Sequence, residues 1–358
     1  MLQTGLLPSA HTDLVTDAAY DFYGLKLATC GVDQRIKVWT QDENSGQWAV
    51  EDDWKAHDAP ITSLSWAHPE YGTIVASTSS DRTTKVWERR HADANTGRRW
   101  VEVASLSDAK GAVRCAGFAP ADFGLKLVTL ASDNVLRLYE CLESASGAQW
   151  ELREELDMAS PFLSTAPTPT VFTPRLALTA PSPSPTNDSE GGGWSLSWCK
   201  ETYWGPCVAV CTPSAPFIRI IHLPPALRPQ CVLSIPVQQG GPACVSWAPL
   251  LGRTHHLLAC GSRDGHVRIF KLPAPTPGEG ADWSYEPLAD FDEHGQGNAV
   301  SKVEWNLTGT VLASSGHDGR VRLWKASYSN VWRSMGYVTA ETSEDVPGGE
   351  GIEEEVED

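Results

Sequence analysis

The chain has 358 residues, more than one ordinary globular domain usually contains, so it is either two domains or one fold built by repetition. Thirty glycines and 25 prolines indicate many turns between short elements, while 41% hydrophobic residues are enough for a sizeable core. A formal net charge of −17 repels phosphate, so the composition argues against a nucleic-acid partner.

The chain start and the cysteines indicate the compartment. The residues after Met1 lack the basic and apolar pattern of a signal peptide, and no apolar run is long enough to span a bilayer. We therefore expect a soluble, intracellular protein without membrane insertion. Its nine cysteines include no Cys-x-x-Cys pair, which predicts reduced core thiols rather than disulfides or zinc ligands.

A turn Asp followed six residues later by an aromatic residue recurs five times along the chain. The pairs are Asp33 and Trp39, Asp81 and Trp87, Asp133 and Tyr139, Asp264 and Phe270, and Asp318 and Trp324. Short β-type runs flank each Asp, so each unit predicts a strand, a tight turn and a second strand. Asp264-Gly265 and Asp318-Gly319 favour the positive φ that such turns need.

Two more strands complete each unit. One precedes the pair and ends at an aromatic residue and a glycine-bearing turn. The other is expected to begin at a tryptophan: Trp48, Trp100, Trp150, Trp283 or Trp332. A further unit at 194–237 replaces the Asp turn by Pro-Ser-Ala-Pro at 213–216, with strands expected at 194–200, 207–212, 217–223 and 231–237.

Six four-stranded units of roughly fifty residues predict an all-β fold, the WD40 β-propeller, whose blades pack face to face around a channel. The 15 tryptophans suit this packing because large flat side chains fill the space between blades. We expect the propeller to span 1–340, with a disordered Pro- and Ser-rich insertion at 159–193 and an acidic disordered tail at 341–358.

Three histidines precede turn aspartates: His11, His57 and His294. Histidine, aspartate and tryptophan together suggest catalysis or metal binding, but the set recurs by blade, whereas an active site would not. We predict a structural role in which the histidine hydrogen-bonds the buried aspartate near the tryptophan. No enzyme motif of the phosphate-loop, zinc-protease or Gly-x-Ser-x-Gly kind occurs, so we predict no catalytic, metal or cofactor site.

The predicted ring has no strand left to close it. A closed WD40 ring usually takes the outer strand of its last blade from the amino-terminal segment. Here 330–339 supplies that strand, and only thirteen residues precede the first strand. We therefore predict an open ring whose seam a partner covers. The candidate seam residues are Leu14, Val15, Ala18, Tyr20, Val300, Val303 and Trp305.

Three parts of the chain carry a family resemblance: 28–39 (ATCGVDQRIKVW), 65–72 with 80–83, and 305–316 (WNLTGTVLASSG) with 321–325. They resemble the SEH-type WD40 nucleoporins, sisters of the Sec-thirteen coat protein, and the similarity runs through all six units. The resemblance implies a non-enzymatic scaffold subunit of the Y-shaped nuclear pore subcomplex that supports pore assembly and nucleocytoplasmic transport. It also implies an α-solenoid partner of the Nup-eighty-five type, which donates a blade in trans.

The resemblance further implies a nuclear envelope location and a second role in the SEA/GATOR assembly, with another solenoid, at the vacuolar or lysosomal surface. Two other interpretations stay open. One is a closed WD40 peptide reader, for which Arg89-Arg90 and Arg98-Arg99 supply nearby cations, and the other is a coat-type (COPII-like) scaffold.

Overall fold

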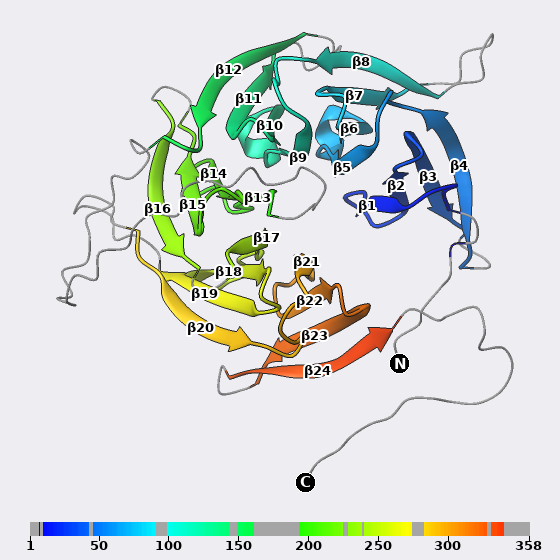
Figure 1. Cartoon of the computed structure of the whole chain (residues 1–358). Helices are drawn as coiled ribbons and strands as arrows, with labels where there is room; N and C mark the ends of the chain where they lie inside the picture. The colour runs from blue at the N-terminus through cyan, green and yellow to red at the C-terminus, as the bar shows by residue number, and fades with distance from the viewer. Residues whose placement is uncertain are drawn as a thin grey trace, which may run out of the picture.

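The computed structural model describes most of the chain, namely residues 7, 10–42, 46–90, 99–142, 149–160, 193–224, 228–237, 240–273, 283–327 and 331–339. These residues form 24 strands in six four-stranded antiparallel sheets, which surround a central axis like the blades of a propeller (Figure 1). Two short 3-10 turns, η1 (Pro69–Tyr71) and η2 (Ala121–Phe123), lie between strands. The predicted all-β, six-bladed propeller is confirmed.

Each blade is built from four strands that are consecutive in the chain. Blade one contains β1 (Val15–Tyr20), β2 (Lys26–Gly31), β3 (Arg35–Gln41) and β4 (Trp48–Lys55). Blade two contains β5 (Ile61–Trp66), β6 (Ile74–Ser79), β7 (Thr84–Arg89) and β8 (Trp100–Leu106). Blade three contains β9 (Val113–Phe118), β10 (Lys126–Ala131), β11 (Val135–Cys141) and β12 (Trp150–Asp157).

The second half of the ring repeats this order, from the inner strand to the rim. Blade four contains β13 (Ser195–Trp198), β14 (Cys207–Cys211), β15 (Phe217–His222) and β16 (Gln230–Pro236). Blade five contains β17 (Pro242–Trp247), β18 (His255–Ser262), β19 (Val267–Pro273) and β20 (Glu286–Phe291). Blade six contains β21 (Val300–Trp305), β22 (Val311–Gly316), β23 (Arg320–Ala326) and β24 (Trp332–Thr339), so its outer strand comes from its own segment.

The tight turns between second and third strands have the geometry that the repeats predict. The residue after each turn Asp has a positive φ: Gln34 (67°), Arg82 (70°), Asn134 (60°), Gly265 (89°) and Gly319 (73°). In all five turns the Asp carboxylate accepts a hydrogen bond from the amide two residues later, at 2.9 to 3.2 Å. This side-chain turn stabilises the left-handed residue even where it is not glycine.

Blade five departs from the expected strand boundaries. Its outer strand begins at Glu286, not at Trp283. The Trp283 ring instead stacks on His256, with centroids 6.2 Å apart, and packs against the hydrophobic cluster between blades four and five. The tryptophan serves the packing of two blades instead of opening a strand.

Five hydrophobic clusters hold the ring together. Each fills the interface of two consecutive blades: one and two, two and three, three and four, four and five, and five and six. In the first, for example, Trp87 of blade two packs with Val38 of blade one. No such cluster joins blade six to blade one among the described residues, and their inner strands barely approach each other. The ring is open at this junction, which we call the seam.

All nine cysteines are buried and unpaired, which confirms the prediction of core thiols. None of the described helices has the length and apolar character needed to cross a membrane. The insertion predicted at 159–193 and the acidic tail at 341–358 lie outside the described residues, apart from 159, 160 and 193.

Candidate functional site

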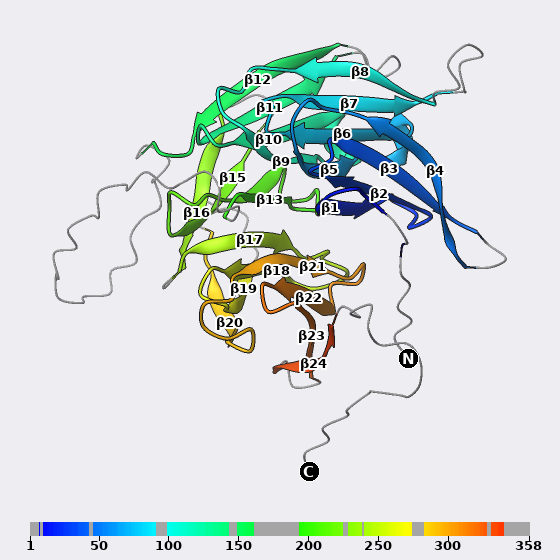
Figure 2. The same ribbon diagram turned by 45° about the vertical axis from the view of Figure 1, so that its right-hand side comes forward.

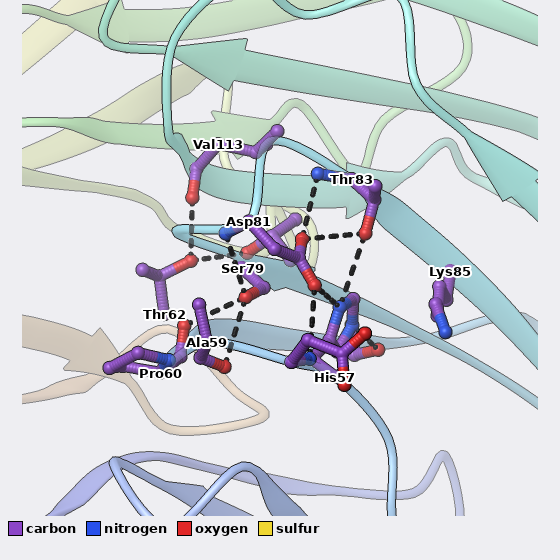
Figure 3. A network of polar contacts seen from close by, with 12 residues as sticks. His57, Ala59, Pro60, Thr62, Ser79, Asp81, Thr83, Lys85 and Val113 are labelled. Carbon is purple, nitrogen blue, oxygen red and sulfur yellow. Dashed lines mark hydrogen bonds and ion pairs between the residues drawn. The ribbon is translucent and has the colours of Figure 1, made fainter.

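A buried polar chain links the turn aspartate of blade two to its tryptophan. His57 Nδ1 lies 2.8 Å from Asp81 Oδ2 (Figure 3). His57 Nε2 lies 2.8 Å from Ser77 Oγ. The indole N–H of Trp87 donates to the same Ser77 oxygen at 2.9 Å. Thr83 donates to Asp81 through both its amide and its hydroxyl. Every polar atom of the set therefore has a partner, as burial requires.

Blades one and six contain the same four-residue set. Their contacts, 2.8 to 3.0 Å long, are His11–Asp33, His11–Thr29 and Trp39–Thr29 in blade one, and His294–Asp318, His294–Ser314 and Trp324–Ser314 in blade six. The hydroxyl residue was not predicted from the sequence. It stands ten positions before the tryptophan in each case, on the second strand, and this constant spacing was its signal.

Ser77, His57 and Asp81 of blade two resemble a catalytic triad, but the serine hydroxyl is not accessible to a substrate. Ser77 is 0% exposed, and its oxygen already accepts the Trp87 indole. Burial lowers the pKa of His57 despite the attraction of Asp81. Burial opposes ionisation of Asp81 too, but hydrogen bonds from Thr83 and the attraction of His57 lower its pKa overall. The set is a neutral histidine holding a buried carboxylate, which is a structural arrangement.

Blades three and five satisfy their turn aspartates with arginine instead. Arg137 Nη2 lies 2.7 Å from Asp133 Oδ2, and Arg268 Nη2 lies 3.0 Å from Asp264 Oδ2. The strand aromatic residue then has a separate role: Tyr139 donates its hydroxyl to Asp108, whereas Phe270 packs in the cluster between blades four and five. The arginine lies four residues after the aspartate, a spacing that blade six also has: Arg322 Nη2 lies 3.3 Å from Asp318 Oδ2, beside the histidine.

The flank of blade one that faces the seam is apolar and partly uncovered. Tyr20, Leu27, Trp39 and Val50 are register partners in turn, so they form a row across the four strands. The corresponding row of blade two packs on blade one through Trp66, Val75 and Trp87. In blade one Leu27 and Trp39, in the middle of the row, are buried, whereas Tyr20 and Val50, at its two ends, are 58% and 46% exposed.

The flank of blade six that faces the seam is uncovered in the same way. Ala313 pairs with Leu323, and Ser315 pairs with Val321. The matching positions of blade one, which face blade two, are fully buried: Ala28, Cys30, Ile36 and Val38. In blade six Val321 is 40% exposed and the other three are half-buried. Equivalent positions are thus buried where a neighbouring blade lies beside them and partly exposed where none does.

The seam residues named on blade one stay a prediction, whereas those named on β21 are wrong about the side of the strand. Leu14, Val15, Ala18 and Tyr20 are exposed. Val300 and Val303 are buried against blade five, and the Trp305 indole donates to Ser246 O of blade five at 3.1 Å. Because side chains alternate along a strand, the seam side of β21 carries the polar residues between them.

One of those polar residues bridges the seam near the axis. Lys302 Nζ lies 2.7 Å from Asp17 Oδ1 and 3.4 Å from Ala18 O, both on β1. Burial lowers the affinity of Lys302 for its proton, but the nearby Asp17 carboxylate outweighs this and raises its pKa. Asp17 also accepts the Leu64 amide of blade two at 2.9 Å. The inner strands line the central channel, so the seam is bridged there and open toward the rim.

Comparison with known proteins agrees with this architecture. The protein-family model described as "WD domain, G-beta repeat" matches residues 3–40, 50–88 and 285–325. These matches end in blades one, two and six, the three blades with the complete histidine set. Nucleoporin SEH1 of Saccharomyces cerevisiae is 35% identical, over 93% of this chain and 98% of that protein. The chain belongs to the SEH1 nucleoporin family.

Two other relatives support the membership. Nucleoporin seh1 of Schizosaccharomyces pombe is 31% identical over 92% of this chain and 95% of its own length. Nucleoporin SEH1 of Homo sapiens is 33% identical over 91% of this chain and 85% of its own length. A WD40 propeller in this family has a structural scaffold role at the nuclear pore. Within the described residues no group of three His, Cys, Asp or Glu side chains is placed to hold a metal.

Proposed function

We propose that this SEH1-family protein is a scaffold subunit of the Y-shaped nuclear pore subcomplex. Its seam receives a blade donated in trans by an α-solenoid nucleoporin of the Nup-eighty-five type. The observation that supports this is the pattern of packing: among the described residues five junctions between blades contain a hydrophobic cluster, whereas the flanks at the sixth have none and are partly exposed. Soluble proteins avoid such surfaces unless a partner buries them.

The energetics favour a stable complex over a transient one. About five main-chain hydrogen bonds at roughly 1 kcal/mol each would not offset the cost of association. Apolar burial must supply the difference, and at about 25 cal/mol per Å² an interface above roughly 2,000 Å² is sufficient. Two blade flanks, one on each side of the seam, can provide a surface of this size.

Co-purification tests the scaffold. We expect the tagged chain to leave cells in a stoichiometric complex with one solenoid nucleoporin, which resists high salt because the contact is mainly apolar. Purification at increasing salt, followed by mass identification, measures this. Fusing the partner's donated blade to the chain should raise its melting temperature. A chain that elutes free and gains nothing from fusion would contradict the proposal and favour a closed peptide reader.

The same seam supports the proposed second role. A solenoid of the SEA/GATOR assembly at the vacuolar or lysosomal surface would use the surface that the nuclear pore partner uses. Because one seam holds one blade, the two complexes exclude each other on a single chain. A coat-type scaffold would differ in the identity of the captured solenoid, which the same mass identification reports.

A further inference from the structure

Two cations face each other at the rim end of the seam flank of blade six. Lys325 on β23 and Arg333 on β24 are register partners, and both are exposed. Trp324, the neighbour of Lys325, points toward blade five, so Lys325 points toward the seam. Within the described residues neither cation forms an ion pair or a hydrogen bond through its side chain. Like charges directly opposite each other destabilise a sheet, so blade six carries an unfavourable pair here.

Comparable cations elsewhere in the ring are neutralised. Lys271 of blade five occupies the position of Lys325, directly after the strand aromatic residue, and pairs with Glu286 of β20 at 3.0 Å. At the junction of blades one and two, Glu51 meets Arg89 and Arg99 of the next blade, with Arg99 Nη1 at 3.0 Å. A carboxylate of the same blade thus neutralises Lys271, and a carboxylate of the neighbouring blade neutralises Arg89 and Arg99.

Apolar residues lie beside the two cations on the same flank. Met335 occupies the bulge of β24, the position that Glu51 holds in blade one, and is 60% exposed. Val321 and Leu323 continue the apolar surface along β23. We call Val321, Leu323, Lys325, Arg333 and Met335 the blade-six flank. It combines an apolar centre with a basic end.

We propose that the donated sheet of the solenoid partner presents carboxylates to Lys325 and Arg333, and that this cation pair determines which sheet the seam accepts. The proposal rests on the proposed function and adds the chemistry of the partner. In the free chain water solvates both cations. A sheet that covers them without carboxylates would bury two unpaired like charges, which costs far more than the exposed pair does. An acidic sheet removes both the repulsion between the two cations and the cost of burying them unpaired. Discrimination therefore comes from rejecting neutral or basic sheets.

Charge reversal on the blade-six flank tests the proposal. The double variant Lys325→Glu, Arg333→Glu is compared with Lys110→Glu, Arg228→Glu, which makes the same charge change at exposed residues of blades three and four. The probe is the purified solenoid nucleoporin captured by co-purification, and its binding is measured at several salt concentrations. We expect roughly a tenfold or greater loss of affinity for the flank variant, a smaller salt dependence, and wild-type affinity for the control.

Three results would overturn the proposal. Unchanged affinity of the flank variant would show that the seam binds its partner without reading these cations, and would leave the proposed function intact. Failure of the wild-type chain to bind any solenoid would remove the proposed function and this inference with it. The third result concerns the chain's own acidic tail. If shortening the chain to 1–340 raised the affinity of the wild type for the solenoid tenfold, but left the affinity of the flank variant unchanged, the tail would be the occupant of the blade-six flank.

A reciprocal change supplies the positive evidence. Replacing acidic residues of the donated sheet by lysine should weaken binding to the wild-type chain and restore binding to the flank variant. Circular dichroism of each chain before mixing checks that the variants are folded. Restoration by the reversed charges is a result that a merely structural role of Lys325 and Arg333 would not produce.

Discussion

At the scale of single residues, one hydroxyl group completes the polar chain of a blade. Thr29, Ser77 and Ser314 each contact a histidine nitrogen and also accept the indole N–H of the strand tryptophan. Aliphatic residues of the same size would leave two buried polar groups without partners. This explains why a β-strand interior, which favours apolar residues, carries a small hydroxyl residue at the same place in three blades.

A different histidine has no such support. His256 is buried between Trp247 and Trp283, and its Nδ1 accepts the Trp247 indole at 3.4 Å. Its Nε2 has no hydrogen-bond partner in the described structure. Burial lowers the pKa of His256 from 6.5 to about 4, with smaller contributions from His255 and Arg253. The folded protein therefore requires the neutral form of this histidine.

The pH dependence of stability follows. A pKa that is lowered in the folded state contributes stability above the unfolded value of 6.5, and this is lost as the pH falls toward 4. We expect His256 to reduce the free energy of unfolding by about 2 kcal/mol between about pH 7.5 and about pH 5. Urea unfolding of the wild type and His256→Phe measures it. The variant should lose this part of the slope, and His317→Phe, at an exposed site, should keep it. Equal slopes would contradict the assignment.

At the scale of elements, β11 shows how a strand can carry a buried charge. Arg137 is 1% exposed and donates to Asp133 within its own strand turn and to Glu155 on β12. Burial disfavours the guanidinium, but the two carboxylates more than compensate and raise the pKa of Arg137. The ion pairs thus connect β11, its turn and the outer strand of blade three.

Removing this guanidinium should be costly, because it leaves a carboxylate without its partner. We expect Arg137→Met to destabilise the protein by about 3–5 kcal/mol. Arg153→Met on β12 is the matched control: Arg153 pairs with Glu140 and Glu151, but near the surface, so its loss should cost about 1 kcal/mol or less. Denaturant midpoints measure both. Similar losses for the two variants would show that burial does not set the energy of these pairs.

At the scale of the whole molecule, the open ring divides the blades into two classes. Blades two to five have a neighbour on each flank, whereas blades one and six each have one packed flank and the seam (Figure 2). Stability in a repeat architecture is a sum over repeats and their interfaces. Each of the two end blades lacks the stabilisation of one blade–blade interface. The Lys302–Asp17 ion pair near the axis replaces only a small part of it.

Native-state hydrogen exchange should detect this difference. In the isolated chain we expect amides of β22 and β23 to exchange through openings of lower free energy than those of β10 and β14, by about 1–2 kcal/mol or more. Binding of the solenoid should remove the difference, because it supplies the missing interface. Mass spectrometry of peptides from each blade measures it. Uniform protection around the isolated ring would mean that the seam flanks are covered without a partner.

The amino-acid sequence by itself determined the repeat. The spacing of turn Asp and strand aromatic residue, the turn at 213–216 and the run of β-type segments were enough to place six blades and to leave no strand for closing the ring. These features act over a few residues, through turn geometry and side-chain alternation, and neighbouring strands of a blade are neighbours in sequence. Most strand boundaries were therefore accessible without the fold.

Only the tertiary structure decided which side chains meet across blades. Val300 and Val303 point toward blade five, and Trp283 packs in an aromatic cluster instead of beginning a strand. Lys302 contacts Asp17, which lies 285 positions away in the sequence. A strand pattern shows that side chains alternate, but not which side has a neighbour. Which side has a neighbour depends on how the blades of the whole chain are arranged in the ring. Because the ring stays open here, no blade lies beside one side of blade six, and that side is exposed.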